Sequence, residues 1–185
     1  MATLAAVILA GGAGRRLSNV DKPALVVGGR RLLDRALDAV EGADPIVVVG
    51  PRREVSRPVR WAREDPPGSG PVAGIAAGIA VLCGTPAPGR TGRAVKASHD
   101  QSAAMPTKTT ETMETTLVAV LAADLVGVTS STIARLVDAV DADVDGVVLI
   151  DADGRAQWLI GVWRLAALRT AMPTDPHGRS LREVF

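Results

Sequence analysis

The sequence predicts an α/β fold, a three-layer αβα sandwich with helices on both faces of a mostly parallel sheet. Two observations carry this prediction. Short apolar runs with the length of buried strands alternate along the chain with segments whose apolar residues recur at helical spacing. A glycine-rich turn directly follows the first apolar run, which is where open α/β sheets bind their ligands.

Each expected element follows from its own pattern. Residues 4–9 and 117–122 are continuous apolar runs, as expected for strands that are buried on both faces. Residues 32–40 repeat leucine and alanine at helical spacing, and Gly42 is the expected stop for that helix. The D-x-D-G run at 151–154 is interpreted as a hairpin tip. The other elements expected are strands at 46–49, 58–62, 146–150 and 158–163 and helices at 71–83, 130–140 and 165–172.

Size and composition fit a single domain, residues 1–185, with 47% apolar and 22% charged residues. The longest apolar runs are far below the roughly 18 residues that a membrane helix needs. No charged region precedes the first apolar run, so we expect a cytoplasmic protein without a membrane partner. Cys83 is the one cysteine of the chain and is expected to act as a small buried hydrophobe.

The net charge of +1 is unevenly distributed along the chain. Residues 1–63 hold 11 basic side chains against six acidic ones, whereas the remainder is acidic. Aromatic residues make up only 2% of the chain, which argues against stacking on nucleic acid and favours a small molecule that carries a polyphosphate. We expect Arg30, Arg31 and Arg35 only to solvate helix faces.

Residues 84–116 interrupt the alternation. They are rich in threonine, proline and glycine and contain almost no large aliphatic side chain. Loops within compact domains are typically about 4 to 6 residues long, so this segment is interpreted as a disordered surface insertion, with a functional flap as the alternative.

The glycine-rich run at residues 9–17, L-A-G-G-A-G-R-R-L, predicts a phosphate cradle. Its glycines let backbone N–H groups approach an anion without a Cβ in the way, and Arg16 and Lys22 add positive charge. A P-loop is disfavoured because no lysine followed by serine or threonine closes the run. A dinucleotide motif is disfavoured because Leu17 stands where its third glycine is needed.

This run, followed by D-K-P at 21–23, resembles the signature of nucleotidyltransferases with a glycosyltransferase-A-like fold, and most closely that of the molybdenum cofactor guanylyltransferases. Two further motifs keep the order of that family. R-E-D at 63–65 precedes G-P-V-A-G at 70–74, and L-A-A-D follows at 121–124. Three motifs in order are far more specific than one.

The resemblance covers roughly residues 4–83 and 117–170 and implies a Rossmann-like sheet of the nucleotide-diphospho-sugar transferase type. It implies Mg²⁺-dependent transfer of GMP from GTP to the terminal phosphate of molybdopterin or its molybdenum complex, with release of pyrophosphate. Arg16 and Lys22 would be catalytic and Asp124 would bind the metal. The nucleotide-binding residues that it implies are Leu9, Ala10, Gly11, Gly12, Gly14, Arg16, Lys22, Asp65, Gly70 and Gly74.

The expected roles follow from the chemistry of a triphosphate. Arg16 would clamp the β- and γ-phosphates through two parallel hydrogen bonds, and Lys22 would reach the α-phosphate. Asp124 ends an apolar strand, where a carboxylate is costly unless it emerges beside a cation, so we expect it to hold Mg²⁺. By resemblance, Asp65 would accept hydrogen bonds from the guanine edge.

Several alternatives remain open at this point. The second metal-binding carboxylate motif of the family is not found, so either Asp124 suffices with waters and phosphates or the chain is a catalytically impaired nucleotide-binding relative. A related enzyme that uses CTP or another acceptor is a further alternative, and a dinucleotide oxidoreductase domain is another. Candidates for the acceptor end are Arg155, Gln157, Trp158 and Arg164, although core tryptophans beside solvated arginines would give the same pattern.

Overall fold

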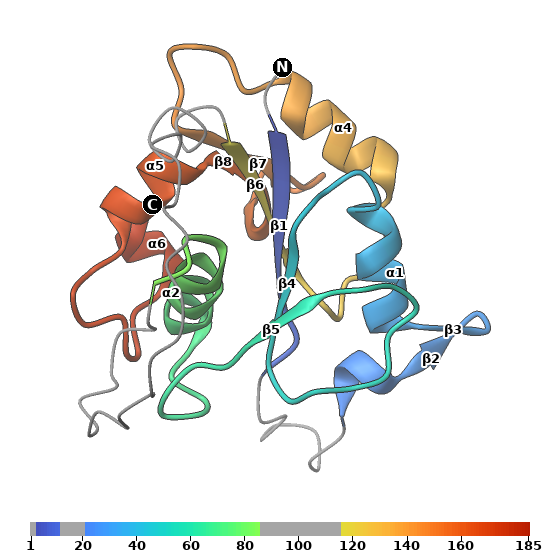
Figure 1. Ribbon diagram of the computed structural model, residues 1–185. Helices are drawn as coiled ribbons and strands as arrows, with labels where there is room; N and C mark the ends of the chain where they lie inside the picture. The colour runs from blue at the N-terminus through green and yellow to red at the C-terminus, as the bar shows by residue number, and fades with distance from the viewer. Residues whose placement is uncertain (1–2, 12–20, 86–115) are drawn as a thin grey trace, which may run out of the picture.

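A six-stranded sheet forms the centre of the protein (Figure 1). The computed structural model describes residues 3–11, 21–85 and 116–185. All six strands lie within two residues of the strands predicted from the sequence, and the spatial order is β5-β4-β1-β6-β8-β7. Their bounds are β1 Thr3–Leu9, β4 Ile46–Val49, β5 Arg60–Ala62, β6 Thr116–Ala122, β7 Gly146–Ile150 and β8 Ala156–Arg164.

The sheet is mostly parallel, as predicted. β1 lies between β4 and β6, and Ala6 pairs with Ile46 on one side and with Ala119 on the other. β5 continues the parallel arrangement beside β4. β8 alone runs antiparallel, to both β6 and β7. The apolar pattern predicted a strand at β8 but not its direction, because side-chain alternation is the same in both directions.

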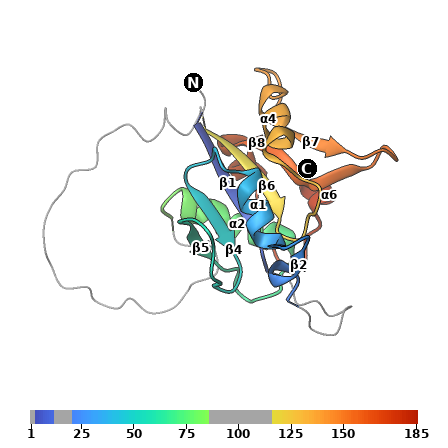
Figure 2. The same ribbon diagram turned by 90° about the vertical axis from the view of Figure 1, so that its right-hand side faces the viewer.

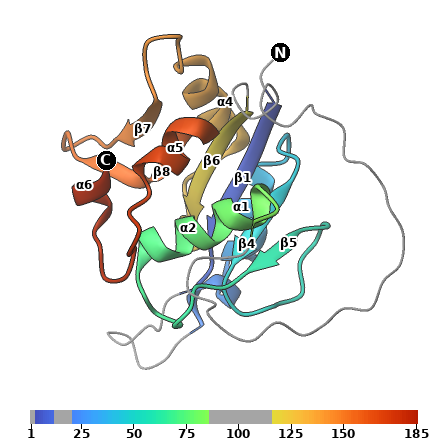
Figure 3. The ribbon, with the colours of Figure 1, turned by 60° about the vertical axis from the view of Figure 1, so that its left-hand side comes forward.

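Helices cover both faces of the sheet, which confirms the three-layer architecture. α1 and α4 lie on one face and α2, α5 and α6 on the other (Figures 1, 2 and 3). Ala6 and Ile8 of β1 face the first pair, whereas Ala5 and Val7 face the second group, so the strand is apolar at every position from Leu4 to Leu9. The helix bounds are α1 Leu32–Ala39, α2 Pro71–Leu82, α4 Ser130–Asp138, α5 Leu165–Ala171 and α6 Leu181–Val184.

A short 3-10 helix and a small hairpin were not predicted from the sequence. η1 spans Lys22–Ala24, and the hairpin pairs β2 (Val26–Val27) with β3 (Arg30–Arg31). Strands of two residues are too short to show a period, but the Gly28-Gly29 pair was an available signal. Both glycines have positive φ, +58° and +77°, which two-residue hairpin turns require.

The arginines near this hairpin do more than solvate a helix face, so that expectation was wrong. Arg30 pairs with Asp38 on α1, with 2.6 Å between Nη2 and Oδ2. Arg31 Nε donates to Asp34 at 2.7 Å, and Arg35 Nη2 donates to the Val27 carbonyl at 2.6 Å. The three side chains therefore tie the hairpin to α1, an effect of tertiary contacts that local composition does not reveal.

The hairpin between β7 and β8 confirms the turn predicted at 151–154. The Asp151 carboxylate accepts hydrogen bonds from the backbone N–H groups of Asp153 and Arg155, at 3.0 and 2.9 Å. Gly154 adopts a φ of +77° there. The aspartates of this run thus stabilise a turn.

The predicted insertion lies almost wholly outside the described residues. Gly84 and Thr85 follow the end of α2, and Thr116 already belongs to β6. Cys83 is half-buried beside α2, and burial raises the pKa of its thiol, in keeping with a small apolar role. None of the helices within the described ranges has the length and apolar composition needed to cross a bilayer.

Gly78 on α2 gives a test of the packing between the helix and the sheet. A Cβ at this position would lie 2.6 Å from Val7 Cγ1 and 3.3 Å from Val49 Cγ2. We expect Gly78→Val to lower the free energy of unfolding by about 1–3 kcal/mol, because the core must shift to admit the side chain. Urea denaturation measures the change.

Gly42→Val is the control for this test, because no heavy atom lies within 4 Å of a Cβ built at Gly42. We expect it to change stability by no more than about 0.5 kcal/mol. Equal losses in the two variants would contradict the packing argument.

Candidate functional site

A cavity of about 480 Å³ opens at the carboxyl ends of the parallel strands. Leu9, Val49 and Ala122, the last residues of β1, β4 and β6, form part of its wall. The volume lies in the range of small-molecule sites, and the carboxyl edge is where open α/β sheets bind ligands. The other lining residues are Gly11, Lys22, Pro23, Glu64, Gly68, Gly70, Pro71, Gly74, Asp124 and Leu159.

The cavity brings together six residues that the sequence predicted for the site: Leu9, Gly11, Lys22, Gly70, Gly74 and Asp124. Ala10 lies behind this wall and is 2% exposed. Its N–H donates to the Val49 carbonyl at 2.8 Å, so that donor is already used within the protein. Three further predicted residues, Gly12, Gly14 and Arg16, fall outside the described residues.

Lys22 and Asp124 meet at this cavity. Lys22 begins η1, Asp124 follows β6, and 3.6 Å separates Nζ from Oδ2. The side chains are 41% and 42% exposed, and exposed pairs of this kind contribute only about 0–1 kcal/mol. A ligand that carries both an anionic group and a cation could therefore separate the two at little cost.

The N-terminus of α2 adds positive potential to the same cavity. Gly70 caps this helix with a φ of +98°, Pro71 is its first residue, and both line the cavity. Helix N-termini present unpaired N–H groups and the positive end of the helix dipole, which favours anions. Gly74 also lets the helix lie close to β1, because a Cβ there would stand 3.0 Å from Leu9 Cδ2.

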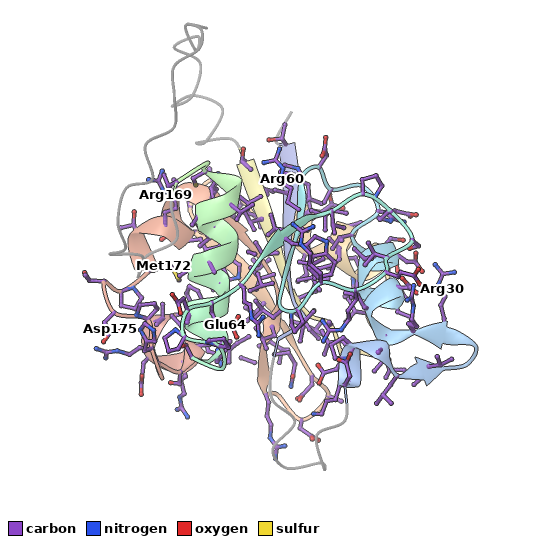
Figure 4. All side chains as sticks on the ribbon, turned by 60° about the horizontal axis from the view of Figure 1, so that its bottom comes forward. Arg30, Arg60, Glu64, Arg169, Met172 and Asp175 are labelled. Carbon is purple, nitrogen blue, oxygen red and sulfur yellow. The ribbon has the colours of Figure 1, made fainter. Side chains whose placement is uncertain are left out.

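Glu64 contributes a carboxylate that the sequence analysis did not assign to the site. It lies beside one end of α2 when the sheet is viewed from its carboxyl edge (Figure 4). Its Oε1 accepts a hydrogen bond from the Gly68 N–H at 3.1 Å and stands 3.2 Å from where a Cβ at Gly11 would lie. The R-E-D motif identified this segment, but only the backbone conformation shows which of its two carboxylates faces the cavity.

Asp65, the residue predicted to contact guanine, does not line this cavity. It borders a much smaller hollow with Pro176 and His177. His177 Nε2 lies 2.9 Å from the Asp65 carbonyl oxygen, and the Gly178 N–H donates to the Ser69 carbonyl at 2.8 Å. The segment after α5 thus holds the loop that leads from β5 to α2.

The donor set at the cavity fits a magnesium ion only together with a ligand. Within the described residues no group of three or more His, Cys, Asp or Glu side chains is arranged to hold a metal. Asp124 is nevertheless partly exposed at the cavity, and Mg²⁺ is commonly held by one or two carboxylates, waters and substrate phosphates. This arrangement suits a metal that arrives with a phosphate ligand.

Comparison with known proteins identifies the family. The family model of the MobA-like NTP transferase domain matches residues 6–184. The chain belongs to this family. Membership confirms the resemblance found in the sequence and the enzyme class, nucleotidyltransferase, and it excludes the dinucleotide oxidoreductase alternative.

One curated relative of this MobA-like domain is the molybdenum cofactor guanylyltransferase of Acidiphilium cryptum (strain JF-5), which is 44% identical over 84 residues. That match covers 41% of this chain and 41% of the relative, so it spans less than half of either protein. The detailed similarity is therefore confined to one part of the chain.

Two solved structures show the same fold. Molybdopterin-guanine dinucleotide biosynthesis protein A from Archaeoglobus fulgidus matches with a TM-score of 0.54 and 18% identity, over 90% of this chain and 72% of its own. A 4-diphosphocytidyl-2C-methyl-D-erythritol synthase matches with a TM-score of 0.56 and 15% identity, over 100% and 84%. At these identities the matches support the Rossmann-like architecture and not a substrate.

The four residues considered for the acceptor end have structural contacts in this MobA-like domain. Arg164 donates to the carbonyls of Val144 and Asp141, at 3.0 and 2.6 Å. The remaining three are engaged near the β7–β8 hairpin or at the C-terminus: Gln157 donates to Asp151, Arg155 lies 4.0 Å from Asp153, and Trp158 stacks on Phe185.

His177 gives a pH-dependent test of the contact between the C-terminal segment and the Asp65 loop. Its hydrogen bonds to Asp175, at 2.7 Å, and to the Asp65 carbonyl raise its pKa above the ordinary value of 6.5. Both ring nitrogens can donate only in the protonated form. The same pair lowers the pKa of Asp175 below 3.8.

We expect the His177 contact to stabilise the fold fully below about pH 6.5, where the unfolded histidine is also protonated, and to lose that effect as the pH rises through the raised pKa. Below pH 3.8, the ordinary pKa of an aspartate, the contact between His177 and Asp175 weakens again as the carboxylate becomes protonated. Thermal melts of wild type and His177→Gln should therefore differ most between about pH 4 and 6.5.

Arg52→Gln, which changes an exposed side chain in the loop after β4, is the control, and its melting temperature should differ from that of the wild type by the same small amount at every pH. A difference between wild type and His177→Gln that stays constant across the whole pH range would contradict the assignment.

Proposed function

We propose that this protein transfers GMP from GTP to the terminal phosphate of molybdopterin or its molybdenum complex, in a Mg²⁺-dependent reaction that releases pyrophosphate. The observation that carries the proposal is the meeting of Lys22 and Asp124 at one cavity beside the N-terminus of α2. A cation, a carboxylate and a helix N-terminus are the groups that a triphosphate with a divalent metal requires.

In this reaction an oxygen of the acceptor phosphate attacks the α-phosphorus of GTP. The new P–O bond forms as the bond from the α-phosphorus to the bridging oxygen of pyrophosphate breaks. A phosphate monoester has its second pKa near 6 and is largely ionised at neutral pH, so the acceptor needs no general base. Positioning and charge neutralisation are then the main tasks of the protein.

We assign these tasks to the residues predicted from the sequence. Lys22 neutralises charge at the α-phosphate, while the Gly11, Gly12 and Gly14 amides and Arg16 bind the β- and γ-phosphates. Asp124 is the residue that would hold Mg²⁺, and the metal would supply positive charge that offsets the repulsion between the reacting phosphates.

GTP is favoured over CTP by the carboxylate at the cavity and by the guanylyltransferase activity named for the curated relative. Guanine presents two adjacent N–H donors on one edge, and a carboxylate can accept both. Glu64 lines the cavity whereas Asp65 does not, so we propose that Glu64 accepts from the guanine edge in place of Asp65.

A thermal-shift panel of GTP, CTP, ATP and NAD, with and without Mg²⁺, tests the donor assignment. We expect GTP with Mg²⁺ to raise the melting temperature of the wild type most, by about 5 °C or more at 100 times the dissociation constant. Asp124→Ala should lose the dependence on the metal. Lys22→Ala should abolish pyrophosphate release while the protein still melts cooperatively.

Asp143→Ala is the control. This exposed aspartate precedes β7, at the amino ends of the parallel strands, whereas the cavity lies at their carboxyl ends. Equal shifts with all four nucleotides would contradict the choice of GTP. A different result would be that the protein binds GTP in a metal-dependent way and releases no pyrophosphate with any acceptor that carries a phosphate monoester. That result would identify it as a catalytically impaired nucleotide-binding relative.

Glu64→Gln and Asp65→Asn form a matched pair that tests the base contact. We expect Glu64→Gln to raise the KM for GTP about tenfold to a hundredfold, since a hydrogen bond to a charged group contributes roughly 1.5–3 kcal/mol. Asp65→Asn should leave it near the wild-type value. Steady-state kinetics with GTP and CTP measure the KM of both variants. If Asp65→Asn raised the KM for GTP more than Glu64→Gln, Asp65 and not Glu64 would be the residue that contacts guanine.

A further inference from the structure

Arg53 connects two walls of the cavity that are far apart in the sequence. Its Nε and Nη2 donate to the two carboxylate oxygens of Asp21, at 3.0 and 2.6 Å. Its Nη1 donates to the carbonyl oxygens of Ala10 and Pro51, at 3.2 and 3.0 Å. One side chain thus holds the end of the β1 segment, the residue before Lys22 and the loop after β4.

The geometry indicates that Arg53 is a positioning residue and not a ligand for phosphate. A guanidinium has five N–H donors, and the bonds to Asp21, Ala10 and Pro51 use four of them. The side chain is only 16% exposed, so little of it can reach a substrate. A charge buried to this extent is stable because it is paired and hydrogen-bonded.

The contacts of Asp21 support the same positioning role for Arg53. It occupies the N-cap position of η1, where an aspartate normally accepts a hydrogen bond from the helix backbone. Here it makes no such bond, and both carboxylate oxygens accept from Arg53 instead. The pair therefore fixes where η1 begins, and Lys22 is the first residue of η1.

Gly50 explains why Arg53 can approach so closely. Its backbone has a φ of +146°, and a Cβ there would lie 2.7 Å from the Ala10 carbonyl carbon and 2.8 Å from the Gly11 nitrogen. The loop after β4 consequently rests directly on the backbone of Ala10 and Gly11.

We propose that Arg53 sets the position of the Lys22 ammonium relative to Gly11 and Asp124, through its paired bonds to Asp21 and Ala10. The proposal rests on the proposed nucleotidyl transfer, in which Lys22 acts on the α-phosphate. Lysine cannot replace Arg53, because a single ammonium cannot reproduce a planar fork on two carboxylate oxygens together with a bond to a carbonyl.

Kinetics of Arg53→Lys, Arg53→Ala and Asp21→Asn test this role, with Arg52→Lys, a change at the exposed neighbouring arginine, as the matched control. We expect the first three to lower kcat/KM for the nucleotide about 100-fold, the typical cost of displacing a catalytic group by about 1 Å. In Arg53→Lys the KM for the acceptor should stay unchanged, because this variant keeps the net charge of the wild type. Arg53→Ala combined with Asp21→Asn should lose no more than either change alone.

A second readout does not require activity. The chain has three lysines, so acylation of Lys22 can be followed by mass spectrometry with Lys96 and Lys108 as internal references. In Arg53→Lys and Asp21→Asn we expect Lys22 to react about two- to fivefold faster than in the wild type, the range set by release of an exposed ion pair. Arg52→Lys should react at the wild-type rate.

Unchanged acylation of Lys22 in both Arg53→Lys and Asp21→Asn would overturn the positioning role, whatever the turnover. Wild-type protein that releases no pyrophosphate, yet shows the faster acylation in these variants, would overturn the proposed reaction and leave the positioning role supported. Asp21→Asn is isosteric and changes a half-exposed side chain, so it serves as the test should Arg53→Ala fail to fold.

Discussion

The parallel pairing of β1 with β4 on one side and β6 on the other determines where every group of the candidate site lies. The register of these three strands brings Leu9, Val49 and Ala122 to the same edge. Because side chains on both faces of β1 are buried, a shift of register would break both cores at once. The loops that follow these strands therefore leave the sheet at fixed, neighbouring points. As a result, Gly11 and Asp124 line the same cavity as Lys22.

The cavity at this edge holds groups of both signs. Lys22 and the N-terminus of α2 attract anions, while Glu64 and Asp124 attract cations and hydrogen-bond donors. A ligand of a single charge would satisfy only part of this set. The proposed ligand, a nucleoside triphosphate with a metal ion and a base that carries N–H groups, would satisfy all of it. The charges of the cavity thus agree with the reaction class that membership of the MobA-like NTP transferase family gives.

The elements that the sequence predicted well are those with a long, regular pattern. The strands of the parallel sheet and helices such as α2 bury apolar side chains at fixed spacing, so their positions were predicted within a few residues. The β2–β3 hairpin was missed because two-residue strands carry no period. Motif order located Lys22, Asp124 and the segment containing Glu64, but the choice between Glu64 and Asp65 depends on backbone dihedrals that a motif does not encode. The Arg53–Asp21 pair spans 32 residues of sequence, and a long-range ion pair of this kind has no local signature.

The docking of the C-terminal segment onto the loop between β5 and α2 has a consequence for biosynthesis. His177 contacts the Asp65 carbonyl across 112 residues of sequence, and the Gly178 N–H bonds to Ser69. A nascent chain on the ribosome lacks these late partners while the loop with Glu64 and Gly70 has already emerged. The wall of the cavity formed by that loop can therefore reach its final arrangement only after residues 177 and 178 have been synthesised, whereas the β1–β4 pairing can form much earlier.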